Sequence, residues 1–160
     1  MVAHRYWDAN VFLAWLKEEP DKLAQCEAGI REAEAGKLVI VTSALTLAET
    51  LYLVRGEIPV APETREKVRS FFRNEYILLH ELDRGIAELA QDVVWDHEVA
   101  AKDAVHVATA LAVGERLPLE QFDTYDGPLI AKSGAMSGLK IGQPAFQVDL
   151  LSDAAAQSAS

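Results

Sequence analysis

The sequence predicts an α/β fold built on a mainly parallel sheet. Short apolar runs typical of strands alternate with helical patterns along most of the chain. The run at residues 38–41 is apolar throughout and stands between Gly36 and Thr42, as expected of a strand that is buried on both faces. The strongest amphipathic pattern follows Asp83 and extends to about residue 97. Strands that alternate with helices in this way need crossover connections, which favour parallel pairing.

The first half of the chain contains two strand patterns and four helical patterns. In order, they are a strand at residues 4–7, helices at residues 11–16 and 21–35, a strand at residues 38–41, and helices at residues 44–55 and 63–72. Gly36 ends the second helix, because glycine readily adopts a positive φ at a helix C-terminus. Pro62 opens the last helix, since proline is favoured in the first turn.

The second half contains two further strands and two helices before a loop-rich end. A strand at residues 76–79 precedes the helix capped by Asp83, whose apolar residues recur at helical spacing: Ile86, Leu89, Ala90, Val93 and Val94. An alanine-rich helix at residues 103–115 leads to a strand at residues 122–124. Three glycines predict a loop at residues 133–142, and residues 147–150 are expected to form an edge strand. We expect one domain over residues 1–151 and a flexible tail over residues 152–160.

Composition limits the classes of protein and of function. The chain has 160 residues, of which 50% are hydrophobic, so it can bury a core without disulfides. Cys26 is the single cysteine, which excludes an internal disulfide and, with the lack of a long apolar run, favours the cytoplasm over a membrane. The formal net charge of −10 argues against binding nucleic acid by charge alone.

Four carboxylates stand where the predicted fold makes them functional candidates. Asp8 directly follows the first strand and Asp126 follows the strand at residues 122–124, so both should reach the carboxyl edge of the sheet, where ligands bind. The Glu49 side chain projects from a largely apolar stripe of its predicted helix. Asp103 is the first residue of a helical face that also carries His106. A carboxylate in such a place is costly unless something positive compensates it.

Converging carboxylates point to a bound metal ion. Without a cation they would repel one another, and some would be protonated at neutral pH. Oxygen ligands favour Mg²⁺ or Mn²⁺ over zinc, and these ions exchange bound water for phosphate oxygens. One or two such ions can activate water and stabilise the leaving oxygen of a phosphodiester. The chemistry that fits is metal-dependent phosphodiester hydrolysis.

Each acid also has an ordinary structural interpretation. Asp8 and Asp103 are in positions to cap helices. Glu49 is open to interpretation as an exposed helix residue, and Asp126 as a turn residue. These alternatives stay open on the sequence alone.

Other chemically versatile residues are expected to have structural roles. His106 is expected to pack near the core or behind the acids, and Cys26 has no partner that would make it a nucleophile. The three tryptophans are expected in the core or at an interface. Asp96 and Asp123 are expected to face solvent.

Four segments together resemble the PIN-domain family, and more narrowly the VapC ribonuclease toxins of type II toxin–antitoxin systems. Their order, spacing and flanking residues match over roughly residues 6–150. The segments are WDANVFL at residues 7–13, TSALTLAE at residues 42–49, KDAVHVATA at residues 102–110 and DTYD at residues 123–126.

The resemblance implies roles for individual residues and a complete activity. Asn10 and Thr124 fall on polar positions that orient the metal site, and Asp123 is the less favoured alternative to Asp126. The resemblance also implies a three-layer Rossmann-like sandwich with strand order 3-2-1-4-5, Mg²⁺ or Mn²⁺ dependence, endonucleolytic cleavage of RNA, a homodimer and an inhibitory antitoxin. The catalytic, metal-binding acids would be Asp8, Glu49, Asp103 and Asp126.

The chain departs from that family in its polar helix at residues 21–35 and its glycine-rich stretch at residues 133–142. Because the chain stays acidic even with two divalent ions bound, RNA binding must rely on local cations and should weaken with salt. The candidate cations for binding RNA are Arg55, Lys102, Arg116 and Lys132.

Phe71 and Phe72 are expected to be exposed and to mark a self-association surface.

Three alternatives to a toxin remain open on the sequence. The first is a PIN nuclease of RNA processing, which would lack a neighbouring reading frame for a small DNA-binding antitoxin. The second is a binding module with a vestigial metal site, which would bind Mg²⁺ without cutting RNA. The third is a phosphohydrolase of small molecules on a related sheet, which would turn over phosphomonoesters and ignore RNA.

Overall fold

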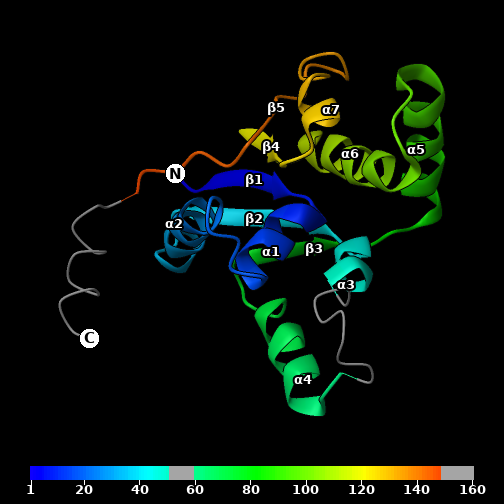
Figure 1. Cartoon of the computed structure of the whole chain (residues 1–160). Coiled ribbons are helices and arrows are strands. Elements are labelled where there is room, and N and C mark those ends of the chain that lie inside the picture. The colour runs from blue at the N-terminus through cyan, green and yellow to red at the C-terminus, as the bar shows by residue number, and fades with distance from the viewer. Residues whose placement is uncertain (51–59, 149–160) are drawn as a thin grey trace.

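The computed structural model describes residues 1–50 and 60–148, which fold around one five-stranded sheet (Figure 1). The order across the sheet is β3-β2-β1-β4-β5, and every pair of neighbours is parallel. The predicted fold class and the strand order implied by the resemblance are therefore confirmed. The strands are β1 (Ala3–Trp7), β2 (Leu38–Ser43), β3 (Ile77–His80), β4 (Gln121–Asp123) and β5 (Ile141–Gly142).

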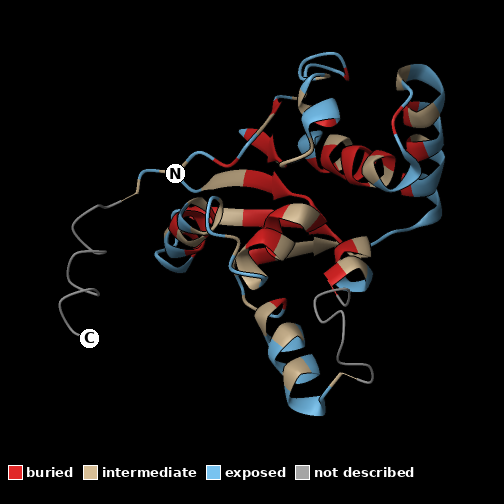
Figure 2. Cartoon of the chain, viewed as in Figure 1, coloured by how far each residue is buried: buried red, intermediate tan, exposed pale blue. Residues whose placement is uncertain are grey.

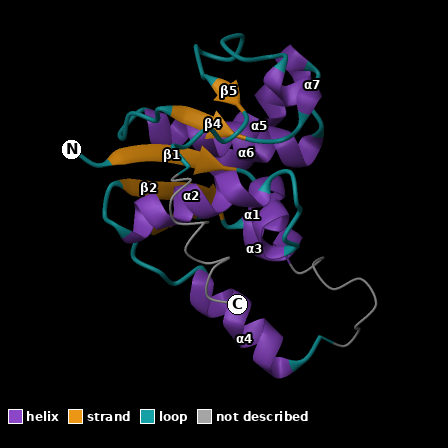
Figure 3. Ribbon diagram, turned by 60° about the vertical axis from the view of Figure 1, so that its left-hand side comes forward, coloured by secondary structure: helices purple, strands orange, loops and turns teal. Residues whose placement is uncertain are grey.

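Helices cover both faces of the sheet, so the molecule has three layers (Figure 3). Helices α1, α2 and α4 pack on one face, and α5, α6 and α7 pack on the other. The helices are α1 (Ala9–Leu16), α2 (Leu23–Glu34), α3 (Leu45–Glu49), α4 (Pro62–Phe71), α5 (Arg84–His97), α6 (Ala101–Gly114) and α7 (Gly127–Ile130).

The central strands are buried on both faces, as the continuous apolar run at residues 38–41 predicts for β2. Successive residues of a strand point to opposite faces. Tyr6 and Val41 therefore join the core under α5 and α6, while Trp7 and Ile40 join the core under α1 and α2. All four are fully buried, and buried residues gather in the central strands and along α6 (Figure 2).

The edge beside β4 differs from the sequence prediction. Strand β5 lies at Ile141–Gly142, inside the stretch expected to be a loop. Residues 147–148 form no strand, and residues 149–150 and the predicted tail at 152–160 lie outside the described residues. Pairing with β4 and a hydrogen bond from the Ile141 N–H to the Ser133 hydroxyl (2.8 Å) hold β5 in place. Two residues carry no detectable strand periodicity, because the pattern needs at least four.

Apart from α7, which the sequence did not predict, and the C-terminal end of α3, the described helix ends lie within two residues of the predicted ones. Helix α5 begins as expected, since the Asp83 carboxylate accepts a hydrogen bond from the Ile86 N–H (2.9 Å). Helix α6 begins at Ala101, two residues before the expected start. The predicted helix at residues 44–55 is described as α3 up to Glu49, and residues 51–59 lie outside the described part.

The predicted exposure of Phe71 and Phe72 is wrong. Phe72 is 6% exposed, and its ring centroid lies 5.1 Å from that of Phe12. Phe71 is partly buried with its ring 4.4 Å from that of Trp15. These contacts fasten α4 onto α1, so both rings belong to the core. Instead, Trp95 on α5 is the tryptophan that reaches solvent, with 68% of its surface exposed.

In residues 1–50 and 60–148, no helix combines the length and the apolar composition that crossing a membrane requires.

Candidate active site

Asp8 is a buried carboxylate at the carboxyl end of β1. It occupies the N-cap position of α1, but its side chain makes no capping hydrogen bond. The residue is 2% exposed, and its Oδ1 has no hydrogen-bond partner among the described residues. Burial raises the pKa of Asp8 to about 7, although the Thr124 hydroxyl opposes this shift. Capping therefore does not explain Asp8, whereas a bound cation would stabilise its charge.

Glu49, the last residue of α3, is held between two nitrogen-bearing side chains. The distance between Glu49 Oε2 and His106 Nε2 is 2.7 Å, and Lys102 Nζ lies 3.7 Å from Oε1. The Glu49 side chain is 16% exposed. It is therefore not the freely exposed helix residue that one interpretation of the sequence allowed.

Asp103 lies half-buried in the first turn of α6. The N-cap position of this helix is Ala100, so Asp103 is not the cap. Burial raises the pKa of Asp103, and the nearby carboxylates of Asp126 and Glu49 raise it further. This mutual repulsion indicates that Asp103, Glu49 and Asp126 share one electrostatic neighbourhood.

The structure brings three of the four acids into one pocket of about 320 Å³ at the carboxyl edge of the sheet. Asp126 does not line this pocket. Its carboxylate caps α7 by accepting a hydrogen bond from the Leu129 N–H (3.2 Å). The polar side chains that line the pocket are Asp8, Asn10, Glu49, Lys102, Asp103 and His106.

Asn10 and Thr124 join α1 to the segment that carries Asp126. Asn10 Nδ2 donates to the Thr124 hydroxyl (3.1 Å), and Asn10 Oδ1 accepts from the Tyr125 N–H (3.0 Å). The Thr124 hydroxyl in turn accepts from the Asp126 N–H (3.0 Å). These bonds fix the start of α7, and with it the Asp126 backbone, relative to Asp8.

Asp123 is not a solvent-exposed residue, and it does not line the acidic pocket. It is completely buried, and its Oδ1 accepts hydrogen bonds from the guanidinium of Arg5 and from Gln121 Nε2 (2.7 Å). Burial raises its pKa to about 6 despite the opposing charge of Arg5. The predicted exposure was wrong because strand alternation turns this side chain into the molecule and toward Arg5 on the paired strand. Asp96, by contrast, is exposed as expected.

The contacts of His106 and Lys102 with Glu49 could not be identified from the sequence. His106 was expected near the core or behind the acids, and it is both 2% exposed and bonded to an acid of the pocket; its partner, Glu49, was not predicted. Its position three residues after Asp103 was the available signal, because this spacing places both on one helical face. Of the other candidate cations, Arg55 lies outside the described residues.

A hard divalent cation suits the chemistry of this pocket. As the side chains stand, no three histidine, cysteine, aspartate or glutamate residues of the described ranges are grouped closely enough to hold an ion. Glu49 is bonded to His106 and Asp126 to the Leu129 N–H, so both are occupied by protein partners. The donors are nevertheless carboxylate oxygens, and one of them, Asp8 Oδ1, is buried without a partner. This donor set is the one that Mg²⁺ and Mn²⁺ prefer.

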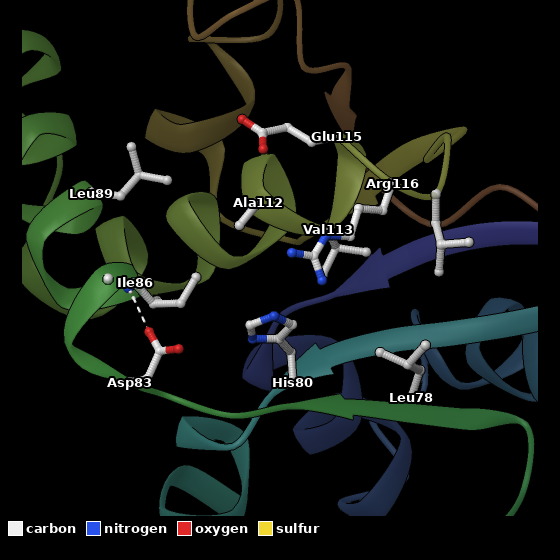
Figure 4. Close-up of a pocket in the computed structure, with 11 residues that line it drawn as sticks. Leu78, His80, Asp83, Ile86, Leu89, Ala112, Val113, Glu115 and Arg116 are labelled. Carbon is white, nitrogen blue, oxygen red and sulfur yellow. Dashed lines mark hydrogen bonds between the residues drawn. The ribbon is translucent and has the colours of Figure 1, made fainter.

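A second hollow, of about 460 Å³, lies between β3, α5 and α6 and holds none of the four acids (Figure 4). Leu78, Ile86 and Leu89 line much of it. Of its two carboxylates, Asp83 caps α5 and Glu115 is exposed at the end of α6. It therefore lacks the donor set of the acidic pocket.

A family model described as PIN domain matches residues 5–126. The chain belongs to the PIN domain family. The match includes Asp8, Glu49, Asp103 and Asp126 and the strands that position them. A comparison with curated proteins finds no match in sequence.

Three solved structures are similar to this PIN domain at low sequence identity. A toxin–antitoxin complex from Klebsiella pneumoniae is 16% identical, covering 89% of this chain and 99% of its own, with a TM-score of 0.57. VapBC2 from Rickettsia felis, bound to a promoter DNA fragment, is 15% identical, covering 88% and 98%, with a TM-score of 0.59. VapC20 from Mycobacterium tuberculosis, a toxin that cleaves the sarcin–ricin loop, is 14% identical, covering 84% and 98%, with a TM-score of 0.61. These similarities establish the shared fold.

Proposed function

We propose that this PIN domain is a divalent-metal-dependent endoribonuclease and the toxin of a toxin–antitoxin pair. The observation that carries the proposal is the acidic pocket, in which Asp8, Glu49 and Asp103 meet at the carboxyl edge of a PIN-domain sheet. Asp126 stands close enough to raise the pKa of Asp103. The similarity in fold between this chain and VapC20, a toxin that cleaves the sarcin–ricin loop, supports RNA as the substrate.

In this proposal the four acids hold Mg²⁺ or Mn²⁺. Such an ion, when bound, activates water and neutralises charge that develops on a phosphodiester. Asp8 contributes a buried carboxylate whose ionisation the cation would favour. Lys102, exposed at the rim, is placed to attract an RNA phosphate, and Asn10 and Thr124 hold the Asp126 segment in place. The products would carry a 3′-hydroxyl and a 5′-phosphate.

The toxin assignment adds partners to the nuclease. Two of the similar structures are toxin–antitoxin complexes, which supports a cognate antitoxin that inhibits this chain. We also propose a homodimer that acts in the cytoplasm, where an RNA target would be met. A small adjacent reading frame whose product copurifies with this chain and blocks cleavage would support the toxin, and its absence would favour a nuclease of RNA processing.

The decisive experiment is cleavage of total cellular RNA by the purified chain in Mg²⁺ or Mn²⁺, followed by mapping of the ends. We expect discrete cuts with 5′-phosphate ends, which are lost in EDTA and in Asp103→Asn. Asp96→Asn is the matched control, because Asp96 is an exposed acid outside the pocket. Cuts that survive both EDTA and Asp103→Asn would refute the proposed mechanism. Metal binding without cleavage would favour the binding module, and turnover of phosphomonoesters the phosphohydrolase.

A further inference from the structure

The imidazole of His106 connects the hydrophobic core to an acid of the pocket. Its Nδ1 lies 2.7 Å from the Tyr6 hydroxyl oxygen, and its Nε2 lies 2.7 Å from Glu49 Oε2. His106 is 2% exposed and Tyr6 is completely buried. Both ring nitrogens thus have protein partners, and the imidazole is almost entirely shielded from solvent.

The proton positions follow from the chemistry of the partners. An ionised carboxylate only accepts hydrogen bonds, so His106 Nε2 must donate its proton to Glu49. In a neutral imidazole Nδ1 then accepts, and the Tyr6 hydroxyl is the donor that it needs. With a neutral imidazole, the chain of hydrogen bonds therefore runs from Tyr6 to His106 to Glu49.

The core fixes the orientation of this imidazole. The Tyr6 ring meets the imidazole edge-on, with centroids 5.9 Å apart and planes at 69°. The same Tyr6 ring stacks on Phe122 at 4.8 Å. Because Tyr6 lies on β1 and Phe122 on β4, the two central strands determine where Nε2 points.

Glu49 consequently offers its two oxygens to different partners. His106 engages Oε2, whereas Oε1 meets Lys102 Nζ at 3.7 Å. The Lys102 side chain is 74% exposed, so water screens this longer contact and weakens it. Oε1 is thus the oxygen that can exchange partners.

We propose that His106 is a positioning residue that holds Glu49 Oε2 and thereby presents Oε1 to a divalent cation. The inference rests on the proposed function, since it needs Glu49 to be a metal ligand. It assigns His106 a task beyond packing the core. Contacts of this kind, made behind a ligand, typically change metal affinity by about 10–100-fold when they are lost.

Two substitutions separate positioning from packing. His106→Gln carries an amide that reaches about as far as Nε2 and can still donate to Glu49. His106→Asn reaches only about as far as Nδ1, so it keeps a partner for Tyr6 and loses Glu49. Both amides are polar and smaller than or similar to imidazole, so a packing role predicts similar effects for the two.

The test is a titration with Mn²⁺ followed by electron paramagnetic resonance of the free ion, on the full chain at pH 7.5. We expect His106→Gln, which keeps the contact with Glu49 but loses the one with Tyr6, to bind Mn²⁺ more tightly than His106→Asn, and His106→Asn to bind about 10-fold or more weakly than the wild type. In the Glu49→Gln background, His106→Asn should cause no further loss, because it acts through Glu49. Tyr6→Phe, which keeps the ring, should also weaken binding only when Glu49 is present, and it serves if His106→Asn does not fold.

The outcomes distinguish this inference from the proposed function. If Glu49→Gln weakens Mn²⁺ binding but His106→Asn and Tyr6→Phe do not, the positioning role is refuted and the metal site stands. Equal losses in the wild-type and Glu49→Gln backgrounds also refute it, since they indicate general damage. A wild-type chain that binds no Mn²⁺, or binds it as well as Glu49→Gln does, overturns both.

Discussion

At the scale of single residues, the buried carboxylate of Asp8 is expected to lower the stability of the metal-free chain. Asp8 is 2% exposed, and its Oδ1 is without a hydrogen-bond partner in the described part of the chain. Removing the charge should therefore stabilise the protein while abolishing cleavage. Such a trade between stability and activity is common at functional sites.

The stability of the metal-free chain should fall between about pH 4 and pH 7 because of Asp8. Burial raises the folded-state pKa from 3.8 to about 7, so in this window the native state binds more protons than the unfolded state. The loss of unfolding free energy caused by the ionised, buried Asp8 carboxylate is complete above pH 7 and absent at low pH. Asp8→Asn should be more stable than the wild type in EDTA at pH 8, by roughly 2–4 kcal/mol, and this difference should shrink at pH 5.

Urea unfolding at the two pH values measures this effect, with Asp96→Asn as the exposed control. Mg²⁺ should stabilise the wild type at pH 8 and should stabilise Asp8→Asn far less. A wild type that is as stable as Asp8→Asn at pH 8 in EDTA would contradict the burial cost.

The buried ion pair of Arg5 and Asp123 provides a second residue-level prediction. Arg5 is 8% exposed, and its guanidinium also lies over the Phe146 ring at 4.3 Å. Arg5→Met should cost about 3–5 kcal/mol, because it leaves the Asp123 carboxylate buried and unpaired. Adding Asp123→Asn should recover much of this loss in urea unfolding at pH 7. A double variant no more stable than Arg5→Met would show that packing by Arg5, not its charge, is what matters.

At the scale of elements, Gly29 allows α2 to approach the sheet. A Cβ at this position would lie 2.7 Å from both Trp7 Cζ2 and Phe146 Cε2. Gly29→Ala should therefore destabilise the chain by about 1–3 kcal/mol, despite the better helix propensity of alanine. At Gly114 in α6 a Cβ would meet nothing within 4 Å, so Gly114→Ala should stabilise by up to about 1 kcal/mol. Thermal unfolding of both variants should show shifts of opposite sign.

Helix α7 depends on the same carboxylate that the proposed function assigns to the metal site. Asp126 caps this helix through the Leu129 N–H. Asp126→Asn should retain the cap and lose RNA cleavage, while Asp126→Ala should lose cleavage and about 1 kcal/mol of stability. Thermal unfolding and the cleavage assay together test this separation. Full activity in Asp126→Asn would remove Asp126 from the catalytic set.

At the scale of the whole molecule, the net charge of −10 limits how the chain could bind the RNA substrate of the proposed function. Few cations contribute, so the dependence on salt should be modest. With two phosphates neutralised on a single strand, kcat/KM should fall roughly sevenfold between 50 and 200 mM KCl. Lys102→Ala should reduce the slope of log(kcat/KM) against log[KCl] by about 0.7. A steep slope, or one that Lys102→Ala leaves unchanged, would contradict this account of binding.

The helices, the strands and the candidate acids could be predicted because each depends on residues that are close together in the sequence. The run at the start of β2 is apolar on successive residues, which indicates a strand buried on both faces. Asp8 could be singled out because it directly follows β1, and Asp103 because it lies in the first turn of the alanine-rich helix α6. Strand β5 was missed because pairing with β4, not its own two residues, defines it.

The sequence by itself determined the alternation of strands and helices, the parallel sheet and the identity of four candidate acids. Only the tertiary structure showed that Asp123 is buried and paired with Arg5, more than a hundred residues away. The same holds for the Tyr6–His106–Glu49 connection, which joins three elements. Hydrophobic periodicity is a property of residues close together in the sequence, so it can be recognised before the chain folds. Hydrogen bonds between side chains far apart in the sequence form only when packing brings those side chains together.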